Sequence, residues 1–176
     1  MSNAYLTRMP AGIPGEVTRH EMATIEPGMF DPNFPSLAFG IFTKVVSGYV
    51  RPIAAADTLA SYTNVNGGFL VRPFPMQEQI ASTAASELIG AGIPNNTLSA
   101  SILKRGYIMV YITTGGGTAY ASIAKGDAVY CRKTAGPGKA VGDLEAGSIA
   151  GNEAIPGAYF MGPADANGYT EIQYYI

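Results

Sequence analysis

Cysteine, histidine and charged residues are all scarce in this sequence of 176 residues. The single cysteine, Cys131, excludes an intrachain disulfide framework and is compatible with folding in a reducing compartment. One cysteine and one histidine, His20, cannot fill a tetrahedral zinc site unless carboxylates complete it. We therefore expect a chain without disulfide bonds, without a metal site and without a cofactor.

Charged residues make up 14% of the chain, against a usual share of about 25%. The 11 basic and 13 acidic residues give a net charge of −2, and the basic residues form no cluster. Because nucleic acid binding depends on clustered Lys and Arg, we expect no nucleic acid partner. No apolar run approaches the roughly 18 residues that span a bilayer, and the first ten residues lack the apolar stretch of a secretory signal. We expect a soluble protein without a membrane partner, made in the cytoplasm.

The first 35 residues are dominated by proline and glycine. Each proline removes a backbone donor and fixes φ near about −65°, so this pattern disfavours a helix and a central strand. The sequence predicts an extended N-terminal arm over residues 1–35, which gains stability by lying on another chain. The arm side chains expected to contact a neighbouring subunit or a larger surface are Tyr5, Ile13, Val17, Arg19, Ile25 and Phe30.

Residues 36–176 have the pattern of a β domain. Runs at 37–46 and 49–53 predict a hairpin with Ser47 and Gly48 in its turn, and residues 107–113 alternate so that Ile108, Val110 and Ile112 share one face. The other strands are expected at 68–74, 120–124, 127–133, 158–162 and 169–176. Short strands with Gly-rich turns indicate a compact antiparallel β-sandwich or a barrel-like domain. Residues 77–96 interrupt the series as either one short helix or a loop.

Residues that could carry catalysis are few. His20 lies in the arm, where no scaffold orients a base, and Cys131 is expected to be an inert core residue. The glycine-rich stretches at 115–117 and 136–139 do not match a phosphate-binding loop and are interpreted as turns. The acidic residues in loops are expected to be solvated turn carboxylates: Asp127, Asp143, Glu145 and Asp165. The sequence therefore predicts no catalytic residue and no enzyme.

Four segments in order along the chain, residues 10–19, 37–51, 157–161 and 164–168, resemble the structural cement proteins of tailed bacteriophage heads. This resemblance implies an auxiliary capsid protein with a compact β domain and an extended N-terminal arm. Such a protein would bind the outside of the phage capsid and bridge neighbouring subunits of the major capsid protein. It would be synthesised in the host cytoplasm, would lie on the virion surface and would have no catalytic residues.

Self-association is expected as well, as a homotrimer or, alternatively, as a dimer, because closed symmetry reuses one interface. Two other functions stay open. A carbohydrate- or receptor-binding module of a tail or spike would need an aromatic platform with carboxylate and amide partners, and the chain has no Trp. A small hydrolase would need carboxylates such as Asp127 and Asp165 in one cleft. The tyrosines expected near surfaces are Tyr5, Tyr62, Tyr169, Tyr174 and Tyr175, the last two being equally suited to packing a strand face.

Overall fold

The chain folds mainly into β-strands, as its sequence pattern predicts. The computed structural model describes residues 12–34, 37–63, 66–72, 99–113 and 118–175. Within them the strands are β1 (Thr24–Phe30), β2 (Phe42–Val46), β3 (Tyr49–Pro52), β4 (Gly67–Val71), β5 (Ser99–Tyr111), β6 (Ala128–Arg132), β7 (Leu144–Ala146), β8 (Asn152–Phe160) and β9 (Tyr169–Tyr175). The helical elements are η2 (His20–Met22), α1 (Leu59–Thr63) and η3 (Tyr120–Ser122). The predicted helix or loop at 77–96 lies outside the described residues.

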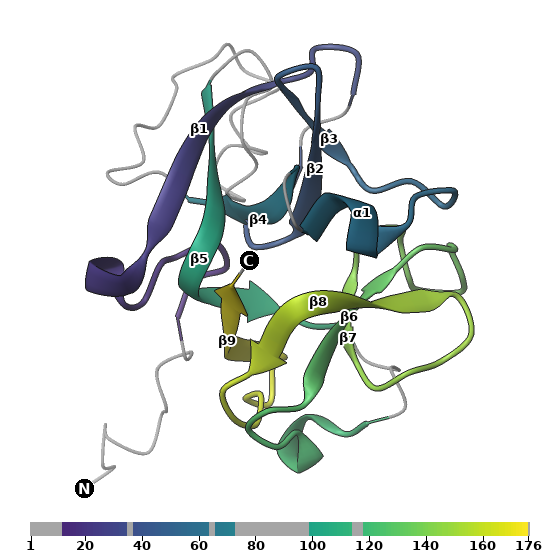
Figure 1. Cartoon of the computed structure of the whole chain (residues 1–176). Coiled ribbons are helices and arrows are strands. Elements are labelled where there is room, and N and C mark those ends of the chain that lie inside the picture. The colour runs from purple at the N-terminus through teal and green to yellow at the C-terminus, as the bar shows by residue number, and fades with distance from the viewer. Residues whose placement is uncertain (1–11, 35–36, 64–65, 73–98, 114–117, 176) are drawn as a thin grey trace, which may run out of the picture.

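Five strands close into a small barrel. The pairing runs from β1 to β3, β2, β4 and β5, and β5 pairs back with β1. All of these pairs are antiparallel except β1 with β3, which run parallel. Figure 1 shows β1 and β5 side by side along one edge, with β2 and β3 opposite them. Of the two architectures expected from the sequence, the barrel is confirmed.

Strand β5 joins this barrel to a second layer of strands. Its first part pairs with β1 and β4, and its second part, from Arg105 onward, pairs with β9. Near the start of the second part lies Gly106, whose φ of 137° favours glycine, and Figure 1 shows that β5 bends along its length. From β9 the sheet continues through β8 and β6 to β7. A bridge between Ile112 and Leu144 brings β7 back against the end of β5.

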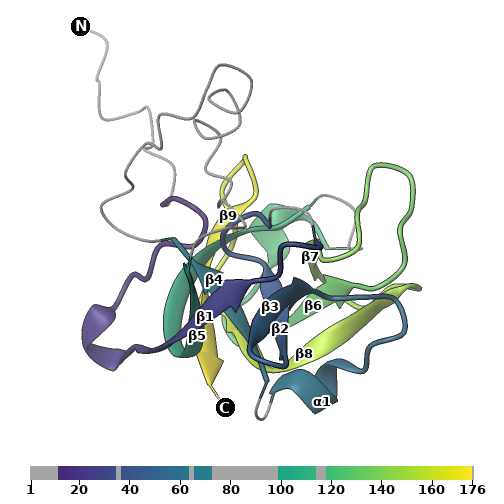
Figure 2. The ribbon, with the colours of Figure 1, turned by 90° about the horizontal axis from the view of Figure 1, so that it is seen from above.

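Two apolar cores result from this arrangement. One fills the barrel and contains Phe30, Leu37, Phe39, Val50, Leu70, Ala100 and Ile102. The larger one lies between the barrel and the second layer, where the rings of Phe42, Phe69 and Tyr174 meet edge to face with centroids 5.2 to 6.0 Å apart. Because β4 is buried on both faces, it supplies side chains to both cores. Helix α1 covers the larger core beside β8 in both ribbon views (Figures 1 and 2).

Most strands predicted downstream of residue 36 are present. The β2–β3 hairpin is confirmed, and its turn residues Ser47 and Gly48 both have positive φ, of 53° and 83°, as tight hairpin turns require. As expected, Ile108 and Val110 of β5 are buried, and so is Ile112, which directly follows this strand. The strand predicted at 120–124 is wrong, because residues 120–122 form the short helix η3. Strand β7 and helix α1 were not predicted, since three and five residues are too short for a periodic pattern.

The first 35 residues were expected to form an extended arm with neither a helix nor a central strand, and the strand at residues 24–30 was missed. These residues form β1, although Pro27 and Gly28 lie within it. Most of β1 is paired along one side only, with β5, and proline is tolerated on such an edge because no donor is needed there. The division of the chain at residue 35 remains a prediction, but residues 24–30 of the N-terminal arm are built into the barrel.

Candidate interaction surface

The outer face of β1 carries a row of exposed apolar side chains. In a strand alternate side chains point to opposite faces, and here Phe30 and the Cα of Gly28 face the barrel interior while Ile25, Pro27 and Met29 face outward. A Cβ on Gly28 would lie 2.8 Å from Val50, so glycine lets the two strands approach. The side chain of Ile25 is 42% exposed and that of Met29 is 59% exposed.

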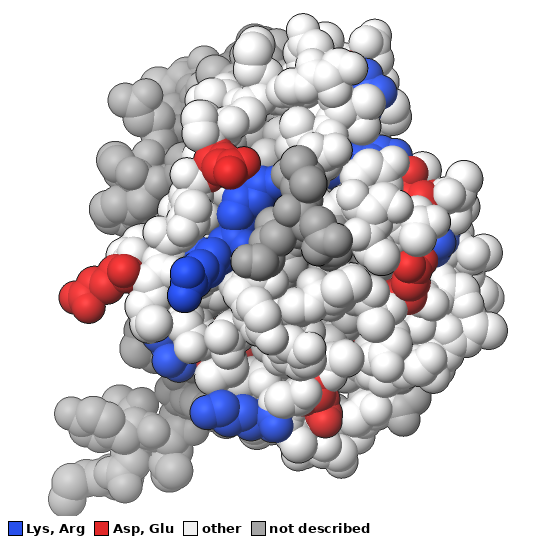
Figure 3. Space-filling model, viewed as in Figure 1, with Lys and Arg blue, Asp and Glu red and all other residues white. Residues whose placement is uncertain are grey.

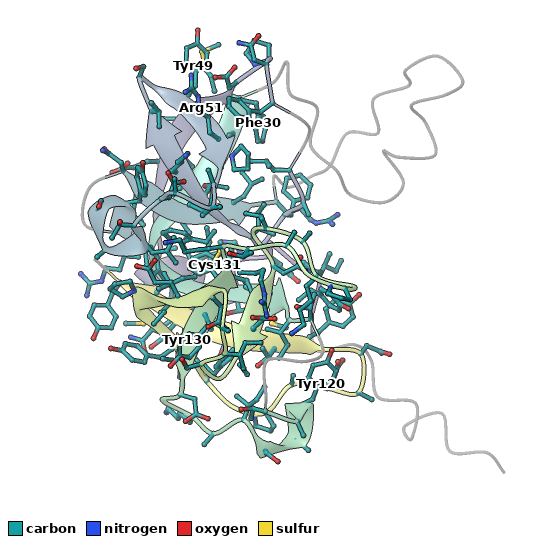
Figure 4. The ribbon with its side chains drawn as sticks, turned by 90° about the vertical axis from the view of Figure 1, so that its right-hand side faces the viewer. Phe30, Tyr49, Arg51, Tyr120, Tyr130 and Cys131 are labelled. Atoms are coloured by element: carbon teal, nitrogen blue, oxygen red, sulfur yellow. The ribbon has the colours of Figure 1, made fainter. Side chains whose placement is uncertain are left out.

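Tyr49 extends this row onto the neighbouring strand. Met29 and Tyr49 are paired in the register between β1 and β3, and Tyr49 is also exposed. We call Ile25, Pro27, Met29 and Tyr49 the β1 row. Below it, Arg51 Nε donates to Asp31 Oδ2 at 2.7 Å. Figure 4 shows Tyr49, Arg51 and Phe30 together at one end of the molecule, with Tyr120 at the other end.

Asp31 holds the turn beneath the β1 row. Its pKa lies below the usual value, mainly because the backbone N–H of Asn33 donates to the carboxylate and because Arg51 lies beside it. The carboxylate is therefore ionised at neutral pH and fixes both the turn and Arg51.

A hollow of about 650 Å³ opens beside η2, between β5, β8 and β9. Its walls include Met22, Tyr107, Tyr159 and Tyr175, together with the cations Arg105 and Lys125. The rings of Tyr159 and Tyr175 stack with centroids 6.1 Å apart and an angle of 27° between their planes. We call this feature the tyrosine hollow. Met22, which is 57% exposed, stands at its edge.

A second hollow, of about 440 Å³, lies where residues 13–14 pass the ends of β5 and β9. Ile13, Phe39 and Arg72 line it together with Tyr111 and Tyr169, whose rings are 5.6 Å apart. Ile13 is about half exposed, and so is Tyr111. This second hollow is a further apolar and aromatic surface, made by elements other than those of the β1 row.

Residues 12–19 lie along the second part of β5 and are hydrogen-bonded to it. The N–H of Gly15 and the carbonyl of Met109 lie 2.8 Å apart, and the N–H of Thr18 donates to the carbonyl of Tyr107. Arg19 Nη2 lies 2.8 Å from Glu171 Oε2, and its guanidinium stacks 4.0 Å from the centroid of the Tyr107 ring. Val17 lies opposite Ile108 and is only 3% exposed.

The residues predicted as arm contacts therefore have different fates. Ile13 and Ile25 are exposed, on different surfaces, whereas Arg19 is half exposed and already paired. Val17 and Phe30 belong to the apolar cores, because the arm residues beside them pair with β5 and β3. Tyr5 lies outside the described residues. Four other exposed apolar or aromatic side chains were not predicted as contacts: Met22, Met29, Tyr49 and Tyr111. The alternation of Ile25, Pro27 and Met29 in the sequence was nevertheless a signal of a strand.

The tyrosines also separate into surface and core. Tyr175 is about half exposed, and Tyr62 and Tyr169 are partly exposed. Tyr174 is fully buried, so its placement near the surface is wrong and the alternative of packing a strand face holds. Burial raises the pKa of its hydroxyl well above the usual value.

The predicted solvated carboxylates are not all solvated. Glu145 is fully buried: Arg132 donates two hydrogen bonds to it, at 2.7 and 2.9 Å, Asn152 donates one at 2.8 Å, and Lys139 Nζ lies 3.0 Å away. Burial raises the pKa of Glu145, but these donors outweigh it and hold the pKa below its usual value. The glycine-rich loop at 136–139 is a turn, and its Lys139 forms an ion pair with the Glu145 carboxylate.

The other candidate groups have structural roles. Asp127 accepts from the N–H of Ala124, and Asp143 from the N–H of Ala140, so both close turns. Asp165 is almost buried and accepts from two backbone N–H groups of its own loop. Cys131 is fully buried, and burial raises its pKa to about 12. His20 lies exposed in η2.

Across the described ranges no group of three or more His, Cys, Asp or Glu residues is placed to hold a metal ion. In the same ranges no helix is long and apolar enough to cross a membrane. The described surface carries apolar and aromatic side chains on its strands and in two hollows. Such side chains are typical of a protein that contacts other macromolecules.

The comparisons with known proteins place this chain among structural proteins of that kind. The model of the family described as "Structural cement protein (E217 gp24/Pam3 gp6)" matches residues 1–175. The chain therefore belongs to the structural cement protein family, and the resemblance seen in the sequence is confirmed.

A solved structure has the same fold. A chain of "The capsid of Myoviridae Phage XM1" superimposes with a TM-score of 0.67 at 18% sequence identity, covering 99% of this chain and 97% of that chain. At this identity the likeness concerns the fold. Among curated proteins, no match to this sequence was found.

Proposed function

We propose that this protein binds the outside of a phage head and bridges neighbouring subunits of the major capsid protein, so that the shell is stabilised. Membership of the structural cement protein family supports this function, as does the shared fold with a chain from a phage capsid. The place of action would then be the outer surface of the virion, after synthesis in the host cytoplasm.

The observation that carries the proposal is the presence of separate contact surfaces on one small domain. A bridge needs at least two of them, and the β1 row and the second hollow are built from different strands. Both present apolar side chains with few charges to desolvate, the composition favoured at the centre of protein interfaces. Buried fully, one large apolar side chain contributes about 1.5 to 3 kcal/mol, so the half-exposed Ile25 and Met29 would each contribute about 1 kcal/mol.

Self-association is part of the proposal. Closed rotational symmetry would let identical copies meet at one surface, and a homotrimer is the first expectation with a dimer as the alternative. Either state would multiply the contacts of each assembly with the shell. Light scattering over a range of concentrations measures this state, and a chain that stays monomeric at tens of micromolar would restrict assembly to the capsid surface.

The experiment that tests binding is co-sedimentation with phage heads that lack the protein. The double variant Ile25→Asp and Met29→Asp puts charge into the β1 row without touching either core, and we expect it to fold normally and to bind heads about tenfold or more weakly. Val141→Asp, at an exposed apolar position outside the β1 row, is the matched control. Undiminished binding by the double variant would remove the β1 row from the contact surface.

A failure of the wild-type protein to sediment with heads at all would contradict the function itself. The tail or spike module then becomes the better account, and binding to cell-surface sugars would be the next measurement. The tyrosine hollow does not favour that alternative, because its described lining contains cations and not the carboxylates typical of sugar sites.

A further inference from the structure

Most basic side chains in the described part of the chain are paired within the protein. Seven of them pair with carboxylates: Arg19, Lys44, Arg51, Lys104, Arg132, Lys133 and Lys139. Arg72 donates to the carbonyl of Pro14. In the part of the chain that the structure describes, the two basic side chains left without an ion pair are Arg105 and Lys125, and both line the tyrosine hollow.

Among the described residues that line the tyrosine hollow, none offsets these two charges. They include no aspartate or glutamate, and both cations are exposed. Figure 3 shows one face of the molecule, on which Lys and Arg atoms form a broken line and Asp and Glu atoms lie in separate patches, one of them against the upper end of that line. Two unpaired cations converging on one hollow, in a chain of net charge −2, create a local site for an anion.

The other residues that line the tyrosine hollow indicate which further chemical groups a bound molecule needs. The stacked rings of Tyr159 and Tyr175 and the exposed Met22 form an apolar side to the hollow. Gln173 and the tyrosine hydroxyls supply hydrogen-bonding groups. An occupant with both an acidic group and an apolar or aromatic side chain would satisfy the two kinds of wall at once.

We propose that the tyrosine hollow is the docking site for an acidic segment of the shell protein, in which an aspartate or glutamate stands beside an aromatic or large apolar side chain. This inference rests on the proposed function, because it names the part of the partner that is bound. The guanidinium of Arg105 suits a carboxylate in a two-pronged arrangement, and Lys125 adds a second positive charge. A nucleic acid fits less well, since a phosphate chain needs cations along its length and this hollow has two.

The first test uses synthetic peptides and the full-length protein, with amide chemical shifts as the readout. We expect acetyl-Glu-Phe-Glu-amide to shift the amides of Gly106, Gly126 and Gln173 in a saturable way, and acetyl-Gln-Phe-Gln-amide to leave them in place. Arg105→Gln and Lys125→Gln should each weaken binding of the acidic peptide about tenfold, as loss of one charge-assisted contact does. Lys133→Gln, a cation outside the hollow that is paired with Glu153, is the control and should bind like the wild type.

The proposal would be overturned if both peptides bound equally well or if neither bound. It would also be overturned if Lys133→Gln weakened binding of the acidic peptide as much as the hollow variants do, or if a six-nucleotide oligothymidylate bound more tightly than the acidic peptide at the same amides. The second test sediments the same variants with heads. Normal binding of Lys125→Gln and Arg105→Gln to heads would refute the hollow as the docking site and leave the proposed function standing. If the wild type failed to bind heads while the acidic peptide still bound, the proposed function would fail and the hollow would remain an acidic-peptide site for another partner.

Discussion

Replacing the buried carboxylate of Glu145 by the amide in Glu145→Gln removes one charge and almost no volume. The carboxylate is enclosed by Arg132, Lys139 and Asn152, with N···O distances of 2.7 to 3.0 Å. In the variant the charges of Arg132 and Lys139, whose side chains are 7% and 17% exposed, lose their counter-charge. Breaking a buried pair on one side costs about 3 to 5 kcal/mol.

That cost converts into a measurable change in melting temperature. For a chain of this length 1 kcal/mol corresponds to about 2 to 4 °C, so Glu145→Gln should melt about 6 to 20 °C below the wild type. Urea unfolding followed by circular dichroism gives the free energy directly. The control is Glu153→Gln, which weakens the more exposed pair with Lys133 and should cost less than about 1 kcal/mol.

The difference between wild type and Glu145→Gln should depend on pH. The folded pKa of Glu145 lies below the value of 4.5 expected without the fold, so the carboxylate stabilises the fold above pH 4.5, and this stabilisation is lost as the pH falls from there through the folded pKa. The two proteins should therefore approach each other in stability below pH 4.5. A loss at pH 7 no larger than that of the control, or a difference independent of pH, would refute the reasoning.

Two further predictions concern the core. Gly67→Ala should lower the free energy of unfolding by about 3 kcal/mol, because its Cβ would lie 2.2 Å from the carbonyl oxygen of Tyr62. Gly162 has open space around it, so Gly162→Ala should change the melting temperature by less than about 2 °C. Similar melting temperatures of the two variants would contradict this packing. Burial raises the pKa of the Cys131 thiol to about 12, so this thiol should not react with Ellman's reagent in the native protein at pH 8. It should react fully in guanidinium chloride. Fast labelling of the native protein would show that the larger core opens.

The strand content and the family were within reach of the sequence alone. Alternation in residues 107–113 and the turn at Ser47 and Gly48 are local features, set by steric preferences that act over a few neighbours. They predicted the last part of β5, from Tyr107 onward, and the β2–β3 hairpin. The short supply of histidine and cysteine likewise bounded the chemistry, because a metal site or a disulfide depends on which residues exist at all.

The fate of the N-terminal arm was decided by tertiary structure. Proline and glycine at positions 27 and 28 argue locally against a strand, yet β5 offers a long unpaired edge, and pairing with it outweighs the local preference. That pairing buries Val17 and Phe30 and turns Ile25 and Met29 outward. The burial of Glu145 and the position of Arg105 and Lys125 around one hollow were also decided by the tertiary structure, because both depend on how strands from different parts of the chain pack together.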